Sequence, residues 1–216
     1  MEERITSRKN PLVQQARKLL SSRKAREETG LFVSDGTKLL KEAAAYWKGL
    51  HTVFLSDGVE AGVPEGVRVI RVSREVMEAI SPMEAPQGAV FLCRLPEKTP
   101  FVPEKGMLLL DGIQDPGNVG TILRTADAWN VPVALLEGCA DPFSHKVVRA
   151  SMGAVFRRPV VVTTWQQAFD ACTRAGIPVG VTALRDTAKD IRTADVGGVC
   201  VVIGSEGQGV RQDILD

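Results

Sequence analysis

The chain has 216 residues, of which 44% are hydrophobic and 25% are charged. This composition is typical of a soluble globular protein of one or two domains. Its 27 Lys and Arg residues against 26 Asp and Glu residues give a net charge of +1, which excludes a strong global field for a polyanionic partner. The N-terminal segment is charged and no 18 apolar residues run together, so we expect a cytoplasmic protein without a membrane span.

The cysteines and histidines predict neither a disulfide framework nor a metal site. The four cysteines, Cys93, Cys139, Cys172 and Cys200, are widely spaced and form no C-x-x-C pair. Three of them lie in or beside apolar runs, as buried free thiols do. The only two histidines, His51 and His145, fall in different predicted domains.

Basic residues gather near the N-terminus. Eight basic residues and no acidic ones occur between Arg4 and Arg26. Asn10 and Pro11 predict the start of a helix here, and Gly30 predicts its end. The basic surface of this helix suits RNA phosphates, and a solvated helix surface is the ordinary alternative. The candidate phosphate ligands are Arg8, Lys9, Arg17, Lys18 and Arg23.

Residues 1–94 are predicted to form a small α/β domain. The expected strands lie at residues 31–33, 51–55, 67–72 and 88–93, and further helices are expected at 38–47 and 73–80. Residues 95–106 contain three prolines among charged residues. Such a segment resists regular structure, so we expect a semi-rigid linker there.

Residues 107–216 are predicted to form a second domain with a parallel sheet. The expected strands lie at residues 107–110, 133–136, 159–162, 177–181 and 199–203. Helices are expected at 119–129, at 142–150 and from Thr164 to Gly176, where Thr164 and Gln167 have the spacing of a capping box. Strands rich in Val, Ile and Leu that alternate with helices indicate a parallel sheet covered on both faces.

The turn after residues 107–110 carries the first candidate site. Gly112, Gly117 and Gly120 allow a close approach to the backbone. Asn118 is expected to cap the next helix, and Arg124 follows six residues later. Ligands of open parallel sheets bind at such strand ends. Taken singly, Asn118 is more simply explained as a helix cap and Arg124 as a solvated side chain.

A second glycine-rich segment, residues 204–209 with the sequence GSEGQG, follows the last strand. Glu206 is expected near the start of a helix, where the helix dipole alone would favour a carboxylate. The order of the glycines is neither a dinucleotide fingerprint nor a P-loop.

Together these two segments resemble the first two motifs of the SpoU (TrmH-like) family of SPOUT RNA ribose 2′-O-methyltransferases. The matching residues are Asn118, Gly120 and Arg124 in the first motif, and Gly204, Glu206, Gly207 and Gly209 in the second. Residues 146–154 resemble the segment between those motifs, and residues 5–11 and 31–36 resemble the substrate-recruiting domain of the family. Many relatives have Glu where this chain has Asp35.

One part of the family pattern is missing from the sequence. The family has a third motif, an Ile-Pro-Met strand and a Ser-Leu-Asn helix start, which completes the cofactor pocket and the trefoil knot. The sequence ends at Ile214-Leu215-Asp216, before such a motif. We therefore expect the knot to be incomplete in this chain.

The resemblance implies a chemistry and a set of residues. Methyl transfer from S-adenosylmethionine to a ribose 2′-hydroxyl would use Arg124, Asn118 and Glu206. Arg149 and Ser151 would hold RNA phosphates, ribosomal RNA is favoured over transfer RNA, and a homodimer is expected. The backbone residues implied for the cofactor are Thr182, Ala183, Leu184, Ile203, Gly204 and Gly207.

Three alternative functions stay open at this point. The chain could methylate transfer RNA, or it could be an RNA-binding module without catalysis. An ordinary nucleotide-binding α/β enzyme is the third alternative, and it is disfavoured because the G-x-G-x-x-G and P-loop signatures are absent from the sequence.

Overall fold

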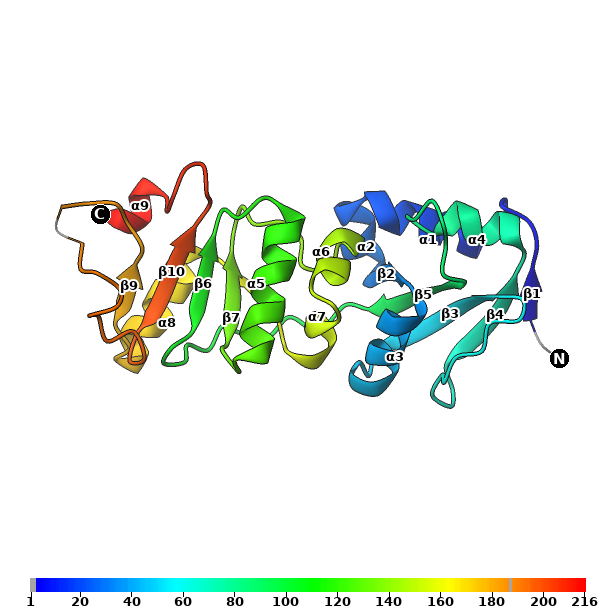
Figure 1. Cartoon of the computed structure of the whole chain (residues 1–216), viewed down its shortest axis with the longest axis horizontal. Coiled ribbons are helices and arrows are strands. Elements are labelled where there is room, and N and C mark those ends of the chain that lie inside the picture. The colour runs from blue at the N-terminus through cyan, green and yellow to red at the C-terminus, as the bar shows by residue number, and fades with distance from the viewer. Residues whose placement is uncertain (1–2, 187) are drawn as a thin grey trace. The chain divides into compact units, whose positions relative to one another are not determined.

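The computed structural model describes residues 3–186 and 188–216, and these form two compact units (Figure 1). The first unit comprises Met1–Glu97 and Phe143–Arg157, and the second comprises Lys98–Pro142 and Arg158–Asp216. Each unit is built around its own five-stranded sheet. In the described part of the chain, no helix has the length and apolar character needed to span a membrane.

The first unit has a mixed sheet with the strand order β1-β4-β3-β5-β2. β1, β4 and β3 are parallel, whereas β5 runs antiparallel to both β3 and β2. The first of these strands was not predicted from the sequence, because three residues give too short a pattern. The strands are β1 (Glu3–Ile5), β2 (Leu31–Asp35), β3 (Leu50–Ser56), β4 (Arg68–Val72) and β5 (Ala89–Arg94).

Two helices replace the single helix that was expected between Asn10 and Gly30. α1 ends at Ser21, and the Ser22 side chain accepts a hydrogen bond from the Ala25 N–H to start α2. Gly30 ends α2 in the left-handed conformation, as expected. The helices of the unit are α1 (Pro11–Ser21), α2 (Arg23–Thr29), α3 (Thr37–Tyr46), α4 (Arg74–Ile80), α6 (His145–Ala150) and α7 (Ala154–Arg157).

An aromatic cluster attaches residues 143–157 to the first unit. The ring of Phe32 on β2 lies 5.1 Å from that of Phe143 and 6.2 Å from that of Phe156. Trp47 also contacts both of these phenylalanines. The sequence assigns this segment to the second domain, but its contacts assign it to the first unit. The borders 1–94, 95–106 and 107–216 stay a prediction.

The second unit has a fully parallel sheet with the strand order β8-β7-β6-β10-β9, as predicted. Leu109 and Val202 pack in one core cluster with Cys172 of α8, while Leu110 and Leu135 are completely buried on neighbouring positions that point to the other face. Both faces are therefore covered. The elements are β6 (Leu108–Asp111), α5 (Pro116–Ala128), β7 (Val133–Leu136), β8 (Val161–Thr163), α8 (Trp165–Ala175), β9 (Val179–Val181), β10 (Cys200–Gly204) and α9 (Gln212–Leu215).

Candidate active site

Three neighbouring strands of the second unit end at the same edge of the sheet. Asp111 at the end of β6 lies opposite Gly204 at the end of β10. Thr182 follows β9, and its backbone N–H donates to the Val202 carbonyl of β10 at 3.0 Å. The two motif segments and residues 182–184 therefore leave the sheet side by side. This is the edge at which open α/β sheets bind ligands.

Asn118 does not cap α5, which corrects the prediction. The helix begins at Pro116, and the Asp115 side chain accepts from the Asn118 backbone N–H at 2.8 Å. Pro116 is suited to the first helical position because it has no N–H to satisfy and its φ is already helical. Asn118 lies in the first turn, so its side-chain amide is available for another contact.

That contact is with Glu206. Asn118 Nδ2 donates a hydrogen bond to Glu206 Oε1, which joins two residues 88 positions apart in the sequence. Asn118 is half-buried and Glu206 is exposed. The hydrogen bond fixes the orientation of the amide and leaves its carbonyl oxygen as an acceptor.

Glu206 also departs from expectation, because it does not lie at a helix start. It occupies a tight turn in which Ser205 and Gly209 exchange backbone hydrogen bonds of 3.2 and 2.8 Å, and α9 begins only at Gln212. A Cβ on Gly204 would lie 2.0 Å from the Gly209 carbonyl carbon. The turn therefore folds back on the end of β10 with backbone against backbone.

Two other glycines leave the backbone open at this edge. A Cβ placed on Gly112 or on Gly207 would meet nothing within 4 Å. Gly112 has φ +63°, a conformation that side chains disfavour. A ligand can approach these peptide groups closely.

An ion pair that the sequence did not reveal joins the two motif segments below the turn. Asp111 is fully buried, and its carboxylate accepts from Arg211 N at 2.9 Å and from Arg211 Nε at 2.7 Å. Arg211 Nη1 lies 3.8 Å from Glu137 Oε1, at the end of β7. The only sequence signal was an acidic residue directly after an apolar strand, which is also common in loops.

Arg124 stands apart from these contacts. It lies on α5, six residues after Asn118, with its side chain exposed. No residue that the structure describes forms a hydrogen bond or an ion pair with its side chain. The structure thus joins Asn118 to Glu206 and leaves the Arg124 guanidinium free for a ligand.

The segments expected to hold S-adenosylmethionine lie at the ends of β9 and β10. Thr182 Oγ1 donates to Val202 O at 3.0 Å, and the Leu184 side chain is fully exposed after β9. Arg211 Nη2 is buried and has no hydrogen-bond partner among the described residues. Ala183 follows β9, and Ile203 and Gly204 end β10 at the same edge of the sheet.

A cysteine also lies beside this edge. Burial raises the pKa of the Cys139 thiol, which donates to Leu110 O at 3.1 Å, so this cysteine remains a protonated thiol. Within residues 3–186 and 188–216, no cluster of three or more His, Cys, Asp or Glu side chains could hold a metal ion.

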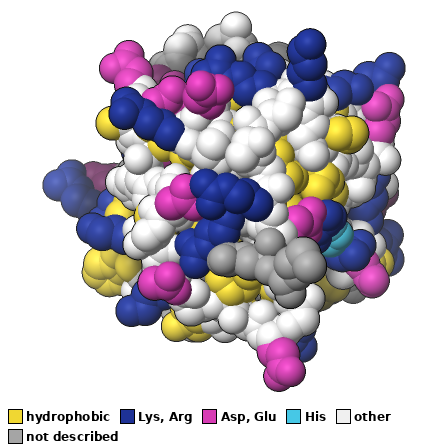
Figure 2. All heavy atoms as spheres, turned by 90° about the vertical axis from the view of Figure 1, so that its right-hand side faces the viewer, with side chains coloured by type: hydrophobic (Ala, Val, Ile, Leu, Met, Phe, Trp, Pro, Cys, Tyr) yellow, Lys and Arg dark blue, Asp and Glu magenta, His cyan; other side chains and the backbone are white. Residues whose placement is uncertain are grey.

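The candidate RNA-binding side chains near the N-terminus differ in whether they already have a bonding partner within the protein. Lys9, Arg17 and Lys18 are exposed, with no ion pair to another described residue. Arg8 Nε donates to the Glu75 carbonyl at 3.0 Å, and Arg23 pairs with Glu27. Figure 2 shows Lys and Arg side chains interspersed with Asp and Glu on one face of the first unit. On this face, acidic side chains interrupt the basic ones.

Arg149 and Ser151 are held inside the first unit. Arg149 Nη1 lies 3.3 Å from Asp35 Oδ2, and burial raises the pKa of this carboxyl even though Arg149 and His145 lower it. The Ser151 side chain is completely buried and donates to Val148 O at 2.7 Å. Its hydroxyl is not accessible to RNA in this structure, and Arg149 is only partly accessible.

Comparison with known proteins gives two family matches, to the SpoU rRNA Methylase family over residues 105–216 and to the MRM3-like substrate binding domain over residues 10–90. The chain is 30% identical over 217 residues to the 23S rRNA (guanosine(2553)-2′-O)-methyltransferase RlmP of Bacillus subtilis, covering 99% of this chain and 87% of that protein. It is 31% identical to the human mitochondrial rRNA methyltransferase 3 over 66% of this chain and 37% of that protein.

Solved structures show the same fold. An rRNA methyltransferase from Sinorhizobium meliloti, also solved with AdoMet bound, superposes with a TM-score of 0.85 at 30% identity, over 99% of this chain and 85% of that one. The SpoU methyltransferase AviRb from Streptomyces viridochromogenes in complex with AdoMet gives a TM-score of 0.79 at 23% identity, over 95% of this chain and 84% of that one. The expected SPOUT fold is confirmed.

Proposed function

Because this chain belongs to the SpoU rRNA methylase family, we propose that it transfers a methyl group from S-adenosylmethionine to a ribose 2′-hydroxyl of ribosomal RNA. The observation that carries the proposal is the hydrogen bond between Asn118 and Glu206, which brings the two family motifs together at the ligand-binding edge of the sheet. The open backbone at Gly112 and Gly207 supports a ligand at the same edge.

The reaction requires an acceptor oxygen that is correctly placed and electrostatically stabilised. S-adenosylmethionine, when bound, supplies an electrophilic methyl group. The backbone of residues 182–184 and 203–207 would hold it, and the Asn118 amide, fixed by Glu206, would orient the ribose. Correct placement alone contributes a large share of such a rate enhancement.

Arg124 would act on the charge that develops at the 2′-oxygen. A guanidinium is protonated at all ordinary pH values, so Arg124 cannot accept the hydroxyl proton. It would instead stabilise the oxyanion and hold a neighbouring RNA phosphate, which receives the hydroxyl proton. The exposure of its side chain, without a partner in the described part of the chain, fits a group that meets the substrate.

The first unit would recruit the RNA, since most of it matches a substrate-binding domain. Lys9, Arg17 and Lys18 offer free cations for phosphates. We place the functional division at the linker 95–106 and the protein in the cytoplasm. A homodimer is also part of the proposal, and sedimentation at twice the chain mass of 23.3 kDa would support it.

The test is transfer of a tritiated methyl group to ribosomal RNA, followed by digestion and identification of 2′-O-methylated nucleosides. Arg124→Ala should lower the turnover number at least a hundredfold, the scale for one stabilising group, while S-adenosylmethionine still binds. Arg174→Ala removes an exposed arginine of α8 in the same unit and serves as the matched control.

Each other outcome of this experiment identifies an alternative. Methylation of transfer RNA but not of ribosomal RNA would mean that transfer RNA is the substrate. RNA binding without transfer by the wild-type chain, under conditions where the cofactor is bound, would contradict the proposed activity and identify an RNA-binding module.

A further inference from the structure

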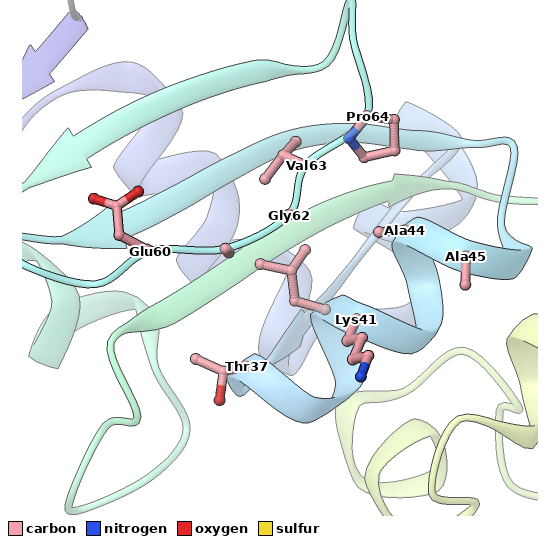
Figure 3. A pocket seen from close by; sticks show the side chains of 10 residues that line it. Thr37, Lys41, Ala44, Ala45, Glu60, Gly62, Val63 and Pro64 are labelled. Atoms are coloured by element: carbon pink, nitrogen blue, oxygen red, sulfur yellow. The ribbon is translucent and has the colours of Figure 1, made fainter.

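A cavity of about 600 Å³ lies in the first unit, between α3 and the loop that follows β3 (Figure 3). It contains no residue of the candidate active site. Thr37, Lys41, Ala44 and Ala45 line the helix side. The loop side is formed by residues 60–64. The volume is in the range of small-ligand pockets, about 300–1,000 Å³.

A partly buried arginine holds the start of the loop that forms one wall of the cavity. Arg71 on β4 donates from Nη1 to Val59 O at 2.6 Å and to Ser56 O at 3.2 Å. Its Nη2 pairs with Glu60 Oε1 at 3.2 Å, and the Arg71 side chain is only 15% exposed. One guanidinium therefore joins the end of β3 to residues 59 and 60 at the start of the loop.

The interior is apolar and one rim is positive. Leu40, Ala44 and Val63 supply apolar surface. Lys41 and the neighbouring Lys38 are exposed, and neither forms an ion pair with a residue that the structure describes. Glu60, on the loop side, carries the only acidic side chain of the lining.

We propose that this cavity receives an unpaired nucleobase of the RNA substrate, with the adjoining phosphate beside Lys41. The inference rests on the proposed function and deepens it. Proteins that select RNA mostly bind bases that are splayed out of single-stranded loops or bulges. The apolar interior suits the faces of a base, and Thr37 and Glu60 are the uncharged polar and the acidic side chain of the lining. None of the lining residues is aromatic, so aliphatic side chains make the contact with the base.

The charge arrangement favours RNA over a neutral ligand. An apolar interior next to a free lysine complements a nucleotide, which joins a flat base to a phosphate. α3 starts at Thr37 on the cavity rim, and no side chain in the described ranges caps it. Its first-turn N–H groups therefore add to the attraction that Lys41 exerts on the phosphate.

The experiment measures binding of the full chain to a fluorescein-labelled 12-nucleotide single-stranded RNA of mixed sequence by anisotropy. Ala44→Trp fills the cavity from the helix, and Ala61→Leu fills it from the loop. We expect each variant to weaken RNA binding about tenfold, a loss of about 1.4 kcal/mol, because the new side chain excludes the base. Lys41→Ala should weaken binding and reduce the slope of log affinity against log salt by about 0.7, the share of one phosphate on a single strand.

Lys48→Ala is the matched control, since Lys48 is exposed just beyond α3 and is not part of the lining. It should change RNA affinity less than twofold. Circular dichroism and thermal melting confirm that the filled variants fold. If folded Ala44→Trp and Ala61→Leu both bind the RNA within twofold of wild type, the proposal is wrong and the cavity serves another kind of ligand.

The experiments distinguish failure of the cavity proposal from failure of the proposed methyltransferase function. If the filled variants lose RNA affinity but the wild-type chain transfers no methyl group, the cavity is an RNA site and the enzymatic proposal fails. If the filled variants methylate ribosomal RNA with the wild-type KM, the enzymatic proposal stands and the cavity proposal is overturned.

Discussion

A charged carboxylate that is fully buried must be neutralised within the protein. Asp111 depends on Arg211 for this, through two hydrogen bonds to the backbone N and to Nε. Asp111 is completely buried, whereas the Arg211 side chain is 36% exposed. The loss of either partner therefore has a different cost. Water can hydrate the exposed part of the Arg211 guanidinium, whereas it cannot reach the buried Asp111 carboxylate.

This asymmetry gives a prediction for the two single variants. Arg211→Gln leaves a buried charge without its partner and should lower the free energy of unfolding by about 3 kcal/mol. Asp111→Asn leaves a partly hydrated guanidinium and should cost less. The double variant should lose less than the sum of the single variants. Urea denaturation of the wild type, the two single variants and the double variant measures these free energies of unfolding. Equal losses in the two single variants would contradict the unequal burial of Asp111 and Arg211.

Two glycines of the second motif differ in what a methyl group would meet. A Cβ on Gly204 would lie within 2.2 Å of backbone atoms of Gly209 and Val210, whereas a Cβ on Gly207 would meet nothing within 4 Å. Gly204→Ala should therefore open the turn and cost about 1–3 kcal/mol. Gly207→Ala should change stability by less than about 0.5 kcal/mol.

Calorimetry of both alanine variants measures this difference, and titration with S-adenosylmethionine shows its consequence for the site. We expect Gly204→Ala to lose cofactor affinity together with the turn. Similar melting temperatures for the two variants would mean that the turn is not packed as described.

Single residues were predicted well where the signal was local, and poorly where it depended on neighbours in space. Asn118 and Asp115 both suit an N-cap, and only the position of Pro116 decides between them. The contact of Asn118 with Glu206 spans 88 positions, so spacing alone could not reveal it. Arg211 had no sequence signal, because its partner is 100 residues away.

At the level of elements, the helix ends that carry their own signals were predicted. α8 begins with the capping box of Thr164 and Gln167 and ends at Gly176, as expected. By contrast, the break between α1 and α2 at Ser22 has no glycine or proline to mark it. The turn that holds Glu206 was mistaken for a helix start, since a carboxylate after a glycine is common in both.

The two histidines lie in the first unit, and burial lowers the pKa of each below the ordinary value of 6.5. His145 opens α6, and its Nδ1 donates a hydrogen bond to the Leu20 carbonyl at 3.3 Å. A lowered pKa means that the folded state binds fewer protons than the unfolded state near pH 6. The stability that these histidines contribute is complete above pH 6.5 and is lost as the pH falls.

We therefore expect the wild-type first unit to lose stability between pH 7.5 and 5.5 (about one pH unit on either side of the unperturbed value). His145→Gln should reduce this loss, and the double variant with His51→Gln should reduce it further. Urea denaturation at the two pH values gives the slope of the free energy of unfolding against pH for each protein. Comparison of slopes, not of absolute stabilities, removes the effect of the lost hydrogen bond to Leu20. An unchanged slope in the double variant would contradict the buried neutral state.

For the whole molecule, charge decides how RNA is attracted. The net charge of +1 gives little long-range attraction, so affinity must come from local groups. Within the basic N-terminal region, Lys9, Arg17 and Lys18 are exposed and have no ion-pair partner among residues 3–186 and 188–216, whereas Arg23 and Lys24 are paired with Glu27 and Glu28. A paired cation releases fewer counterions when it meets a phosphate.

The last prediction concerns this division between free and paired cations. Replacing Lys9, Arg17 and Lys18 together by alanine should flatten the dependence of log affinity on log salt by about 2 for a single-stranded RNA, from about 0.7 per phosphate contact. The control variant, with Arg23 and Lys24 replaced by alanine, should change the slope by less than one contact. The measurement is anisotropy titration of the same labelled RNA between 50 and 200 mM salt, the range over which such contacts are resolved. Equal changes per residue in the two variants would mean that the helix attracts RNA only through its total charge, and the phosphate contacts would then have to lie elsewhere on the first unit.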